Sequence, residues 1–252
     1  MKGPVVVGVD GSASDRGVVE AAAREADRRD TALRLVHAMG WSAGAAAWDP
    51  AGRAVRERVS AILTEAERRA RQVAPHLDVA QDVLIGDPGP VLETESSDAS
   101  LAVVGGRCPE HPHKGSVAGH LSTHARCPVL VVRGRPEPGG TVVLAGDGSP
   151  GMREAAEFAF AEAAARGADL TALHPHVLAG MLHDLRAAHP GVTVHDHPVP
   201  GRFGRTVTVA SAHAQLVVLA ARGRRRMAWE ALRRSLLRDA GCPVAVVPAP
   251  GR

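Results

Sequence analysis

The sequence lacks tyrosine and has few other aromatic residues. Three tryptophans and three phenylalanines are its whole aromatic content, 2% of 252 residues. Proteins that bind single-stranded nucleic acid stack the bases on aromatic side chains, so we expect no nucleic-acid partner. The absence of tyrosine also removes that residue as a catalytic acid. Hydrophobic residues still make up 45% of the chain, which predicts a core built from valine, leucine and alanine.

Long hydrophobic runs, cysteine and lysine are scarce as well. No run reaches the roughly 18 apolar residues of a membrane span, so we expect no membrane partner. The three cysteines form no CxxC pair, and a strand pattern follows the first residues without a visible signal peptide, which together predict a cytoplasmic protein. Only two of the 30 basic residues are lysines. We interpret the arginine-rich run 222–226 as a solvated face rather than a phosphate-binding patch.

The motifs of several enzyme classes are missing. The sequence has no G-x-S-x-G nucleophile elbow, no Walker lysine motif and no HExxH zinc motif. It also shows no pair of carboxylates at active-site spacing. His120 and His124 share a helix face four residues apart, but zinc needs three or four converging ligands. We therefore predict a non-enzymatic protein with no catalytic residues and no metal site.

An internal repeat is the strongest pattern in the chain. The segment VVVGVDGS at 5–12 returns as VVLAGDGS at 142–149, and ARCPVLVV at 125–132 returns as AGCPVAVV at 240–247. The offset is 137 residues between Asp10 and Asp147 but 115 between Cys127 and Cys242, so the second copy lacks 22 residues. We predict domains at 1–133 and 141–252, joined by a Pro/Gly-rich linker at 134–140.

Each copy alternates short apolar strands with helical patterns. In the first copy, strands are predicted at Val5–Asp10, Leu33–Ala38, Leu77–Ile85, Leu101–Gly105 and Val129–Arg133. Helices are predicted at Ser14–Arg29, Arg53–Val73, Pro88–Ser97 and Ser116–Ala125, with Ser14 as the cap of the first. Apolar strands separated by helices predict an α/β fold with a parallel, doubly wound sheet. Such a sheet binds ligands at the carboxyl ends of its strands, where the strand order reverses.

Taken together, these segments resemble the universal stress protein (UspA) family. The resemblance rests on the strand ending Val9-Asp10-Gly11-Ser12, the Leu-Val-His strand, the glycine-rich segment after the fourth strand and the final Cys-Pro-Val-Leu-Val-Val. It covers nearly the whole chain and implies two tandem domains of the adenine nucleotide alpha hydrolase-like fold, each with a five-stranded parallel sheet. Many family members bind ATP through a G-x2-G-x9-G-[ST] segment after strand four. Others lack this segment and do not bind ATP.

The resemblance implies a nucleotide site in the first copy. By that resemblance, Asp10 and Ala38 border the adenosine of ATP or another adenine nucleotide, which is accompanied by Mg²⁺. The residues implied around the phosphates are Val104, Gly105, Arg107, Cys108, Gly115, Ser116 and Val117. Glycines let backbone N–H groups approach phosphate oxygens, and a helix N-terminus favours an anion. The resemblance also implies a protein partner or a homodimer.

Both copies depart from the family pattern. In the first, Cys108 replaces the second glycine, six rather than nine residues precede Gly115-Ser116, and two prolines remove N–H donors. In the second, the Gly-Ser pair is replaced by Glu230-Ala231. We predict that this carboxylate stands at the start of a helix and repels phosphate, so that the second copy does not bind ATP in the family manner.

Three functions follow from these observations. The first is a non-catalytic regulatory protein of the stress response that binds ATP through the degenerate loop of its first copy. The second is an interaction scaffold without any ligand, which the degeneracy of both loops supports. The third is a weak nucleotide hydrolase on the same fold, against which stands the lack of a recognisable base and metal ligands.

Overall fold

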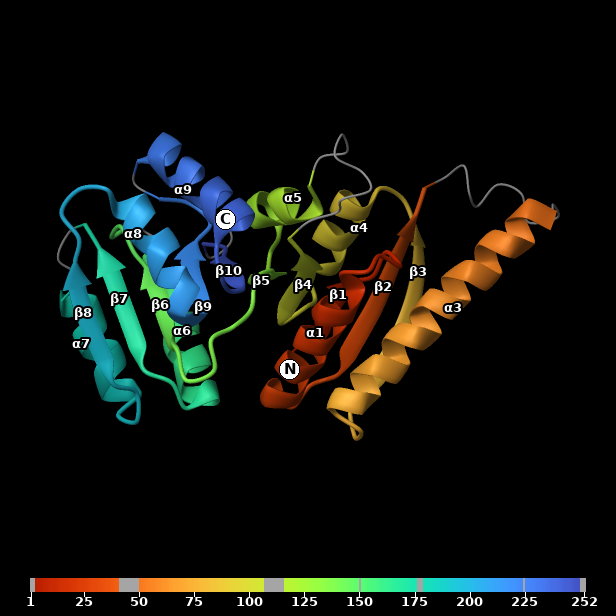
Figure 1. Cartoon of the computed structure of the whole chain (residues 1–252), viewed down its shortest axis with the longest axis horizontal. Helices are drawn as coiled ribbons and strands as arrows, with labels where there is room; N and C mark the ends of the chain where they lie inside the picture. The colour runs from red at the N-terminus through yellow and green to blue at the C-terminus, as the bar shows by residue number, and fades with distance from the viewer. Residues whose placement is uncertain are drawn as a thin grey trace. The chain divides into compact units, whose positions relative to one another are not determined.

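The computed structural model describes residues 3–40, 50–106, 116–149, 151–175, 179–223 and 225–249. The chain divides into two compact units, Met1–Val132 and Arg133–Arg252. Each unit is an α/β domain with a five-stranded parallel sheet, which confirms the predicted fold (Figure 1).

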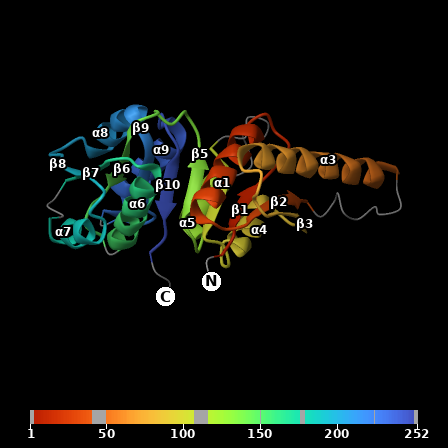
Figure 2. The same ribbon diagram turned by 90° about the horizontal axis from the view of Figure 1, so that it is seen from below.

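The first unit alternates strands and helices throughout. Its elements are β1 (Val5–Gly8), α1 (Asp15–Arg29), β2 (Leu33–Met39), α3 (Pro50–Val73), β3 (Val79–Ile85), α4 (Pro88–Glu95), β4 (Leu101–Gly105), α5 (Val117–His124) and β5 (Val129–Val132). The strand order is β3-β2-β1-β4-β5. Helices α1 and α3 pack together on one face of this sheet, and α4 and α5 pack on the other (Figure 2).

The second unit has the same order of strands along the chain but shorter connections. Its elements are β6 (Thr141–Ala145), α6 (Met152–Arg166), β7 (Leu170–His174), α7 (Ala179–Ala188), β8 (Val194–Pro198), α8 (Phe203–Ala210), the 3₁₀ turn η1 (Ser211–His213), β9 (Ala214–Ala220), α9 (Arg226–Asp239) and β10 (Val244–Val247). The strand order is β10-β9-β6-β7-β8. The ten-residue α7 stands where the first unit has the 24-residue α3, which accounts for most of the length difference between the copies.

The core of each unit is aliphatic, as the composition predicts. Strands β1 and β4 are buried along most of their length, with Val5, Val7, Leu101 and Val103 fully inaccessible to solvent. Such near-continuous burial is typical of parallel strands that are covered by helices on both faces. Among the described residues, few aromatic side chains are buried in the core; Phe160 and Trp229 are two of them.

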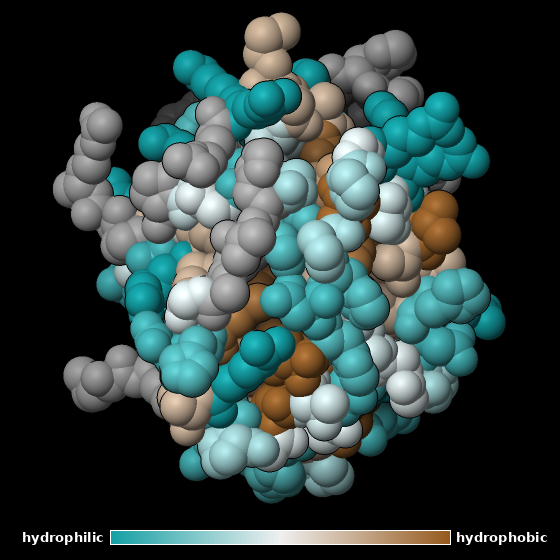
Figure 3. All heavy atoms as spheres, turned by 90° about the vertical axis from the view of Figure 1, so that its left-hand side faces the viewer, coloured by the Kyte–Doolittle hydropathy of each residue, from teal (hydrophilic) through white to brown (hydrophobic). Residues whose placement is uncertain are grey.

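The edge strand β8 presents polar side chains to solvent. Four of its five residues are exposed, including His195 and His197. Figure 3 shows the face of the molecule that carries β8 and α7, and hydrophilic residues dominate it. Charged and polar side chains along an open edge discourage pairing with the strands of other molecules.

One predicted detail, the capping role of Ser14, is wrong. Ser14 occupies the cap position of α1, but its side chain makes no capping hydrogen bond; its hydroxyl lies 2.7 Å from that of Ser12. The predicted linker is anchored to the second unit, because Arg135 N donates to Gly241 O at 2.9 Å and Glu137 N donates to Ala214 O at 3.1 Å. A Pro/Gly-rich composition thus marks an ordered connection here rather than a free one.

Candidate functional site

The carboxyl ends of β1 and β4 form the topological switch point of the first sheet. The chain moves from β1 outward to β2 and β3, then returns to place β4 on the other side of β1. The parallel register pairs Val7 with Val103, so the residues that follow β1 and β4 leave the sheet side by side. Asp10 and Gly105 therefore lie at the same end of the sheet, where doubly wound sheets bind their ligands in a crevice.

The turn after β1 is held by two carboxylates. The Asp10 carboxylate accepts the N–H of Ser12 at 2.9 Å, and the Asp15 carboxylate accepts the N–H groups of Asp10 at 3.1 Å and Gly11 at 2.6 Å. Gly11 has a φ of +81°, and a side chain there would overlap with Ile62 of α3. These contacts fix the place of the Asp10 carboxylate at the rim of the crevice.

The two carboxyl groups differ in proton affinity. Burial, together with the neighbouring Asp10 carboxylate, raises the pKa of Asp15 to about 7. Burial also acts to raise the pKa of Asp10, but the hydrogen bonds from Ser12 and Asp15 outweigh it, so this pKa is lowered. At neutral pH the pair therefore holds an ionised Asp10 beside an Asp15 that is close to half protonated. Sequence reasoning missed Asp15, although an acidic residue in the first turn of α1 was a visible signal.

Strand β2 ends next to the turn that follows β1. The Nδ1–H group of His37 donates a hydrogen bond to Val9 O at 2.8 Å, which ties β2 to the end of β1. Ala38 follows it and is partly exposed at the end of the strand. The structure thus brings Ala38 and Asp10 to the same end of the sheet.

Helix α5 follows β4 along the chain. Ser116 is its N-cap, and the hydroxyl oxygen accepts the N–H of Gly119 at 3.2 Å. Any helix leaves the N–H groups of its first turn without partners inside the helix, so α5 offers donors at Val117 and beyond. Val104 is 3% exposed, so its side chain belongs to the core and only its backbone reaches the site. Three predicted site residues, Arg107, Cys108 and Gly115, lie outside the described residues.

In the second unit, Trp229 packs against the carboxyl end of β9. Its side chain is 5% exposed and its indole N–H donates to Ala220 O at 2.7 Å, at the carboxyl end of β9. A side chain added at Gly223 would overlap with both the indole and the carboxylate of Asp147. The indole therefore lies next to Gly223 and the Asp147 carboxylate, at the carboxyl ends of β6 and β9.

The prediction for Glu230 is wrong. Helix α9 begins at Arg226, four residues earlier than the helix start inferred from the Cys242 spacing. Glu230 consequently lies one turn inside α9, where its carboxylate is 3.4 Å from Arg234, and it cannot act at the helix N-terminus. The described cysteines are not site residues either, because burial raises the pKa of both the Cys127 and the Cys242 thiols to about 12.

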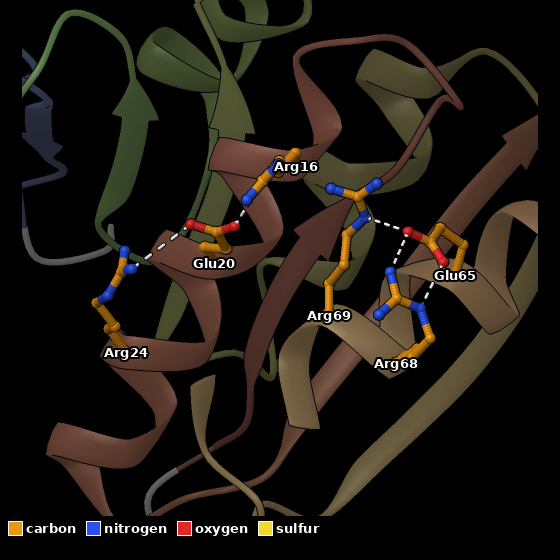
Figure 4. A network of polar contacts seen from close by, with 6 residues as sticks. All are labelled: Arg16, Glu20, Arg24, Glu65, Arg68 and Arg69. Carbon is orange, nitrogen blue, oxygen red and sulfur yellow. Dashed lines mark hydrogen bonds and ion pairs between the residues drawn. The ribbon is translucent and has the colours of Figure 1, made fainter. Parts of the chain in front are cut away.

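Ion pairs cover the outer surface of α1 and α3 (Figure 4). Glu20 lies between Arg16 and Arg24 on α1, and Glu65 lies between Arg68 and Arg69 on α3. The hydrogen bond from Arg68 is the main cause that lowers the pKa of Glu65 to about 2. A shallow hollow between Arg56 and Arg68 follows this exposed side of α3. Its lining comes from one helix, and exposed ion pairs of this kind contribute little to stability.

Known proteins resemble this chain along its length. The universal stress protein family matches residues 1–133. "Universal stress protein Rv2623" of Mycobacterium tuberculosis (strain ATCC 25618 / H37Rv) is 31% identical over 262 residues, covering 87% of this chain and 86% of that protein. "Universal stress protein Rv1996" of the same strain is 30% identical over 272 residues with the same coverage.

A solved structure agrees with the fold of the whole chain. The crystal structure of a universal stress protein from Archaeoglobus fulgidus DSM 4304 matches with a TM-score of 0.79 at 17% identity, covering 98% of this chain and 96% of that one. In the described part of this chain, the helices are all too short or too polar to cross a membrane.

Proposed function

Because this chain belongs to the universal stress protein family, we propose that it is a non-catalytic regulatory protein whose first domain binds ATP or another adenine nucleotide. We assign that domain to residues 1–133, the connection to 134–140 and the second domain to 141–252. A protein partner or a second copy of this chain responds to the nucleotide, because a bound ligand changes the surface around the start of α5.

The pairing of β1 with β4, which brings the residues after both strands to one end of the sheet, is the observation that supports this proposal. The ionised Asp10 carboxylate faces the position of the ribose hydroxyls, and the start of α5 supplies N–H donors and a positive dipole end for the phosphates. Val104 and Gly105 bring the backbone of β4 close to the same groups. Arg107, Cys108 and Gly115 complete the proposed phosphate contacts.

The residues present fit a nucleotide without aromatic stacking. Among the described residues, the neighbours of Asp10 and Ala38 along β1 and β2 include Val9 and Val36, and we propose that the adenine ring packs against valine and alanine side chains. Mg²⁺ that accompanies a triphosphate is bound mostly through phosphate oxygens and water. The protein therefore needs no complete set of metal ligands of its own for this role.

We assign nucleotide binding to the first domain alone. The indole of Trp229 fills the crevice of the second domain and its N–H is satisfied by Ala220. A nucleotide there would have to displace a buried side chain and leave its hydrogen bond unmade. The burial of that indole outweighs any favourable contact from the turn at Asp147, which repeats the turn at Asp10.

A pair of substitutions at Ser116 tests the phosphate contact. Aspartate and asparagine both cap helices as well as serine does, so Ser116→Asp and Ser116→Asn differ mainly in charge. At an effective dielectric constant of about 20, a unit charge about 6 Å from a phosphate charge costs about 3 kcal/mol, or roughly 100-fold in affinity. Calorimetric titration with ATP should show this loss for Ser116→Asp and near wild-type affinity for Ser116→Asn. Equal affinities in the two variants would refute the phosphate site, and no binding by the wild type would favour the ligand-free scaffold.

The Asp10–Asp15 pair favours a weak nucleotide hydrolase as the second candidate. A carboxyl group that keeps its proton beside one that is ionised is an arrangement that can act as acid and base. Phosphate release from ATP with Mg²⁺, measured on the wild type and on Asp15→Asn, separates the two candidates. Our proposal predicts no release above the protein-free rate, whereas release that disappears in Asp15→Asn would establish the hydrolase.

A further inference from the structure

Three metal-ligand side chains converge on the outer face of α4 and α5, apart from the nucleotide crevice. Glu93 of α4 and His120 and His124 of α5 each place one ligand atom within 4.8 Å of the other two. In the sequence, the two histidines have no third ligand close to them. The fold supplies this ligand as Glu93 of α4, which lies 27 residues before His120 in the chain. We propose that these three residues form a binding site for a zinc-like divalent ion.

Close packing of the two helices holds the first two ligands in place. His120 Nε2 lies 2.6 Å from a carboxylate oxygen of Glu93. A Cβ atom at Gly89 of α4 would lie 3.1 Å from the His120 ring, so the absence of a side chain there leaves the space that the imidazole fills. Ser96 tightens the same junction, because its hydroxyl oxygen accepts the N–H of Arg126 at 2.9 Å.

The third ligand is oriented by its own helix. His124 Nδ1 lies 3.0 Å from the carbonyl oxygen of His120, and a carbonyl oxygen can only accept, so Nδ1 carries the proton. The lone pair of His124 is therefore on Nε2. Metal-binding histidines commonly have this arrangement, in which a hydrogen bond to one ring nitrogen sets the tautomer that leaves the other free.

The distances require only small adjustments of the side chains. Ligand atoms around a tetrahedral zinc ion with bonds of 2.0–2.1 Å are about 3.3 Å apart. Glu93 and His120 are already closer than this, and the ring of His124 lies 4.6 Å from that of His120 between centroids. Because His124 is exposed, its ring can turn toward the pair without disturbing the core. The ion takes the place of the proton between His120 and Glu93, which is released on binding.

The ligand set selects the class of ion. Two imidazoles and one carboxylate suit zinc and neighbouring transition ions, whereas magnesium and calcium prefer sites made of oxygen ligands. Three protein ligands leave one coordination position for water or for a group on another molecule. Binding would join α4 to α5, the helix that begins at the proposed phosphate contact, although the site itself does not depend on nucleotide.

Zinc titration of the metal-free, tag-free full chain tests this site. Calorimetry with ZnCl₂ should show one saturable ion per chain, and Co²⁺ in its place should give the visible absorption of a tetrahedral complex. We expect His124→Ala and Glu93→Gln each to weaken Zn²⁺ binding by at least the roughly 10- to 100-fold that loss of an outer-shell partner costs. Glu93→Gln keeps a hydrogen-bonding group next to His120 but is a poor ligand.

His76→Ala is the matched control. His76 is an exposed histidine 2.9 Å from the Asp27 carboxylate in the same domain, and in the described residues it belongs to no group of three ligands. We expect this variant to bind zinc as the wild type does. The proposal is overturned if the wild type shows no saturable zinc binding, if both site variants retain full affinity, or if His76→Ala loses as much as they do. Far-UV circular dichroism of each metal-free variant verifies that it is folded.

Discussion

Replacing Asp15 with asparagine should stabilise the first domain at alkaline pH and leave it unchanged at acidic pH. The pKa of Asp15 is about 7 in the folded chain and 3.8 as the ordinary value. At pH values between these two pKa values, the folded chain keeps a proton on Asp15 that the unfolded chain has lost. The free energy of unfolding therefore falls as the pH rises through this range. The penalty is fully present above pH 7 and absent below about pH 4. Asparagine cannot ionise, and its side-chain oxygen still accepts the N–H of Gly11.

The size of the effect follows from the shift. A difference of about 3 pH units at 1.36 kcal/mol each gives a ceiling of about 4 kcal/mol. Asp15 is only partly buried, so solvent screening reduces this to about 1–2 kcal/mol. For a domain of this size, that corresponds to a rise of a few degrees in the melting temperature.

Thermal and urea unfolding at pH 5 and pH 8 measure this difference directly. Asp30→Asn is the control, because Asp30 is an exposed residue at the end of the same helix with a φ of +50° that asparagine tolerates. We expect the gain of Asp15→Asn over wild type to be larger at pH 8 than at pH 5, and Asp30→Asn to show no such difference. If Asp15→Asn changes stability equally at both pH values, the carboxyl does not hold a native-state proton and the reasoning is wrong.

Two further predictions concern the second domain and the thiols. Gly223→Ala should destabilise the second domain by about 1–3 kcal/mol in urea unfolding, because the added methyl group overlaps with the Trp229 indole. Gly191→Ala is the control and should cost far less, because the space around its Cβ position is open. Equal losses of stability in the two variants would contradict the close packing of Trp229 against Gly223. Cys127 and Cys242 are buried, and burial raises the pKa of both thiols to about 12. In the Cys108→Ser variant, which keeps only these two cysteines, the native protein should not react with a thiol reagent at pH 8, whereas the unfolded protein in denaturant should show two reactive thiols. Fast labelling of the native variant would contradict their burial.

Much of the fold was predictable because the chain repeats itself. Buried parallel strands such as Leu101–Gly105 are continuous apolar runs, and their spacing between helical patterns leaves few alternatives to a doubly wound sheet. The cap of α5 was predictable for the same reason, since Gly115-Ser116 stands at a fixed distance before the strongly patterned strand that ends the domain. Local signals were reliable wherever a long apolar pattern surrounded them.

The candidate site was less predictable because it depends on contacts between distant segments. Asp15 acts on a turn that precedes it, and its raised pKa comes from burial and from the Asp10 charge rather than from its neighbours in sequence. Counting from Cys242 places Glu230 at a helix start, but α9 begins at Arg226 and Trp229 packs at the carboxyl end of β9. Glu93 meets His120 and His124 only after α4 and α5 pack against each other.

The number of nucleotides bound per chain is the most direct test of the account. Native mass spectrometry of the full chain with saturating ATP, together with its Ser116→Asp and Ser116→Asn variants, counts bound nucleotides without assuming where they bind. We predict one nucleotide on the wild type and on Ser116→Asn, and none on Ser116→Asp at the same concentration. Two nucleotides on the wild type would contradict a closed second crevice, and none would contradict the proposed function of the first.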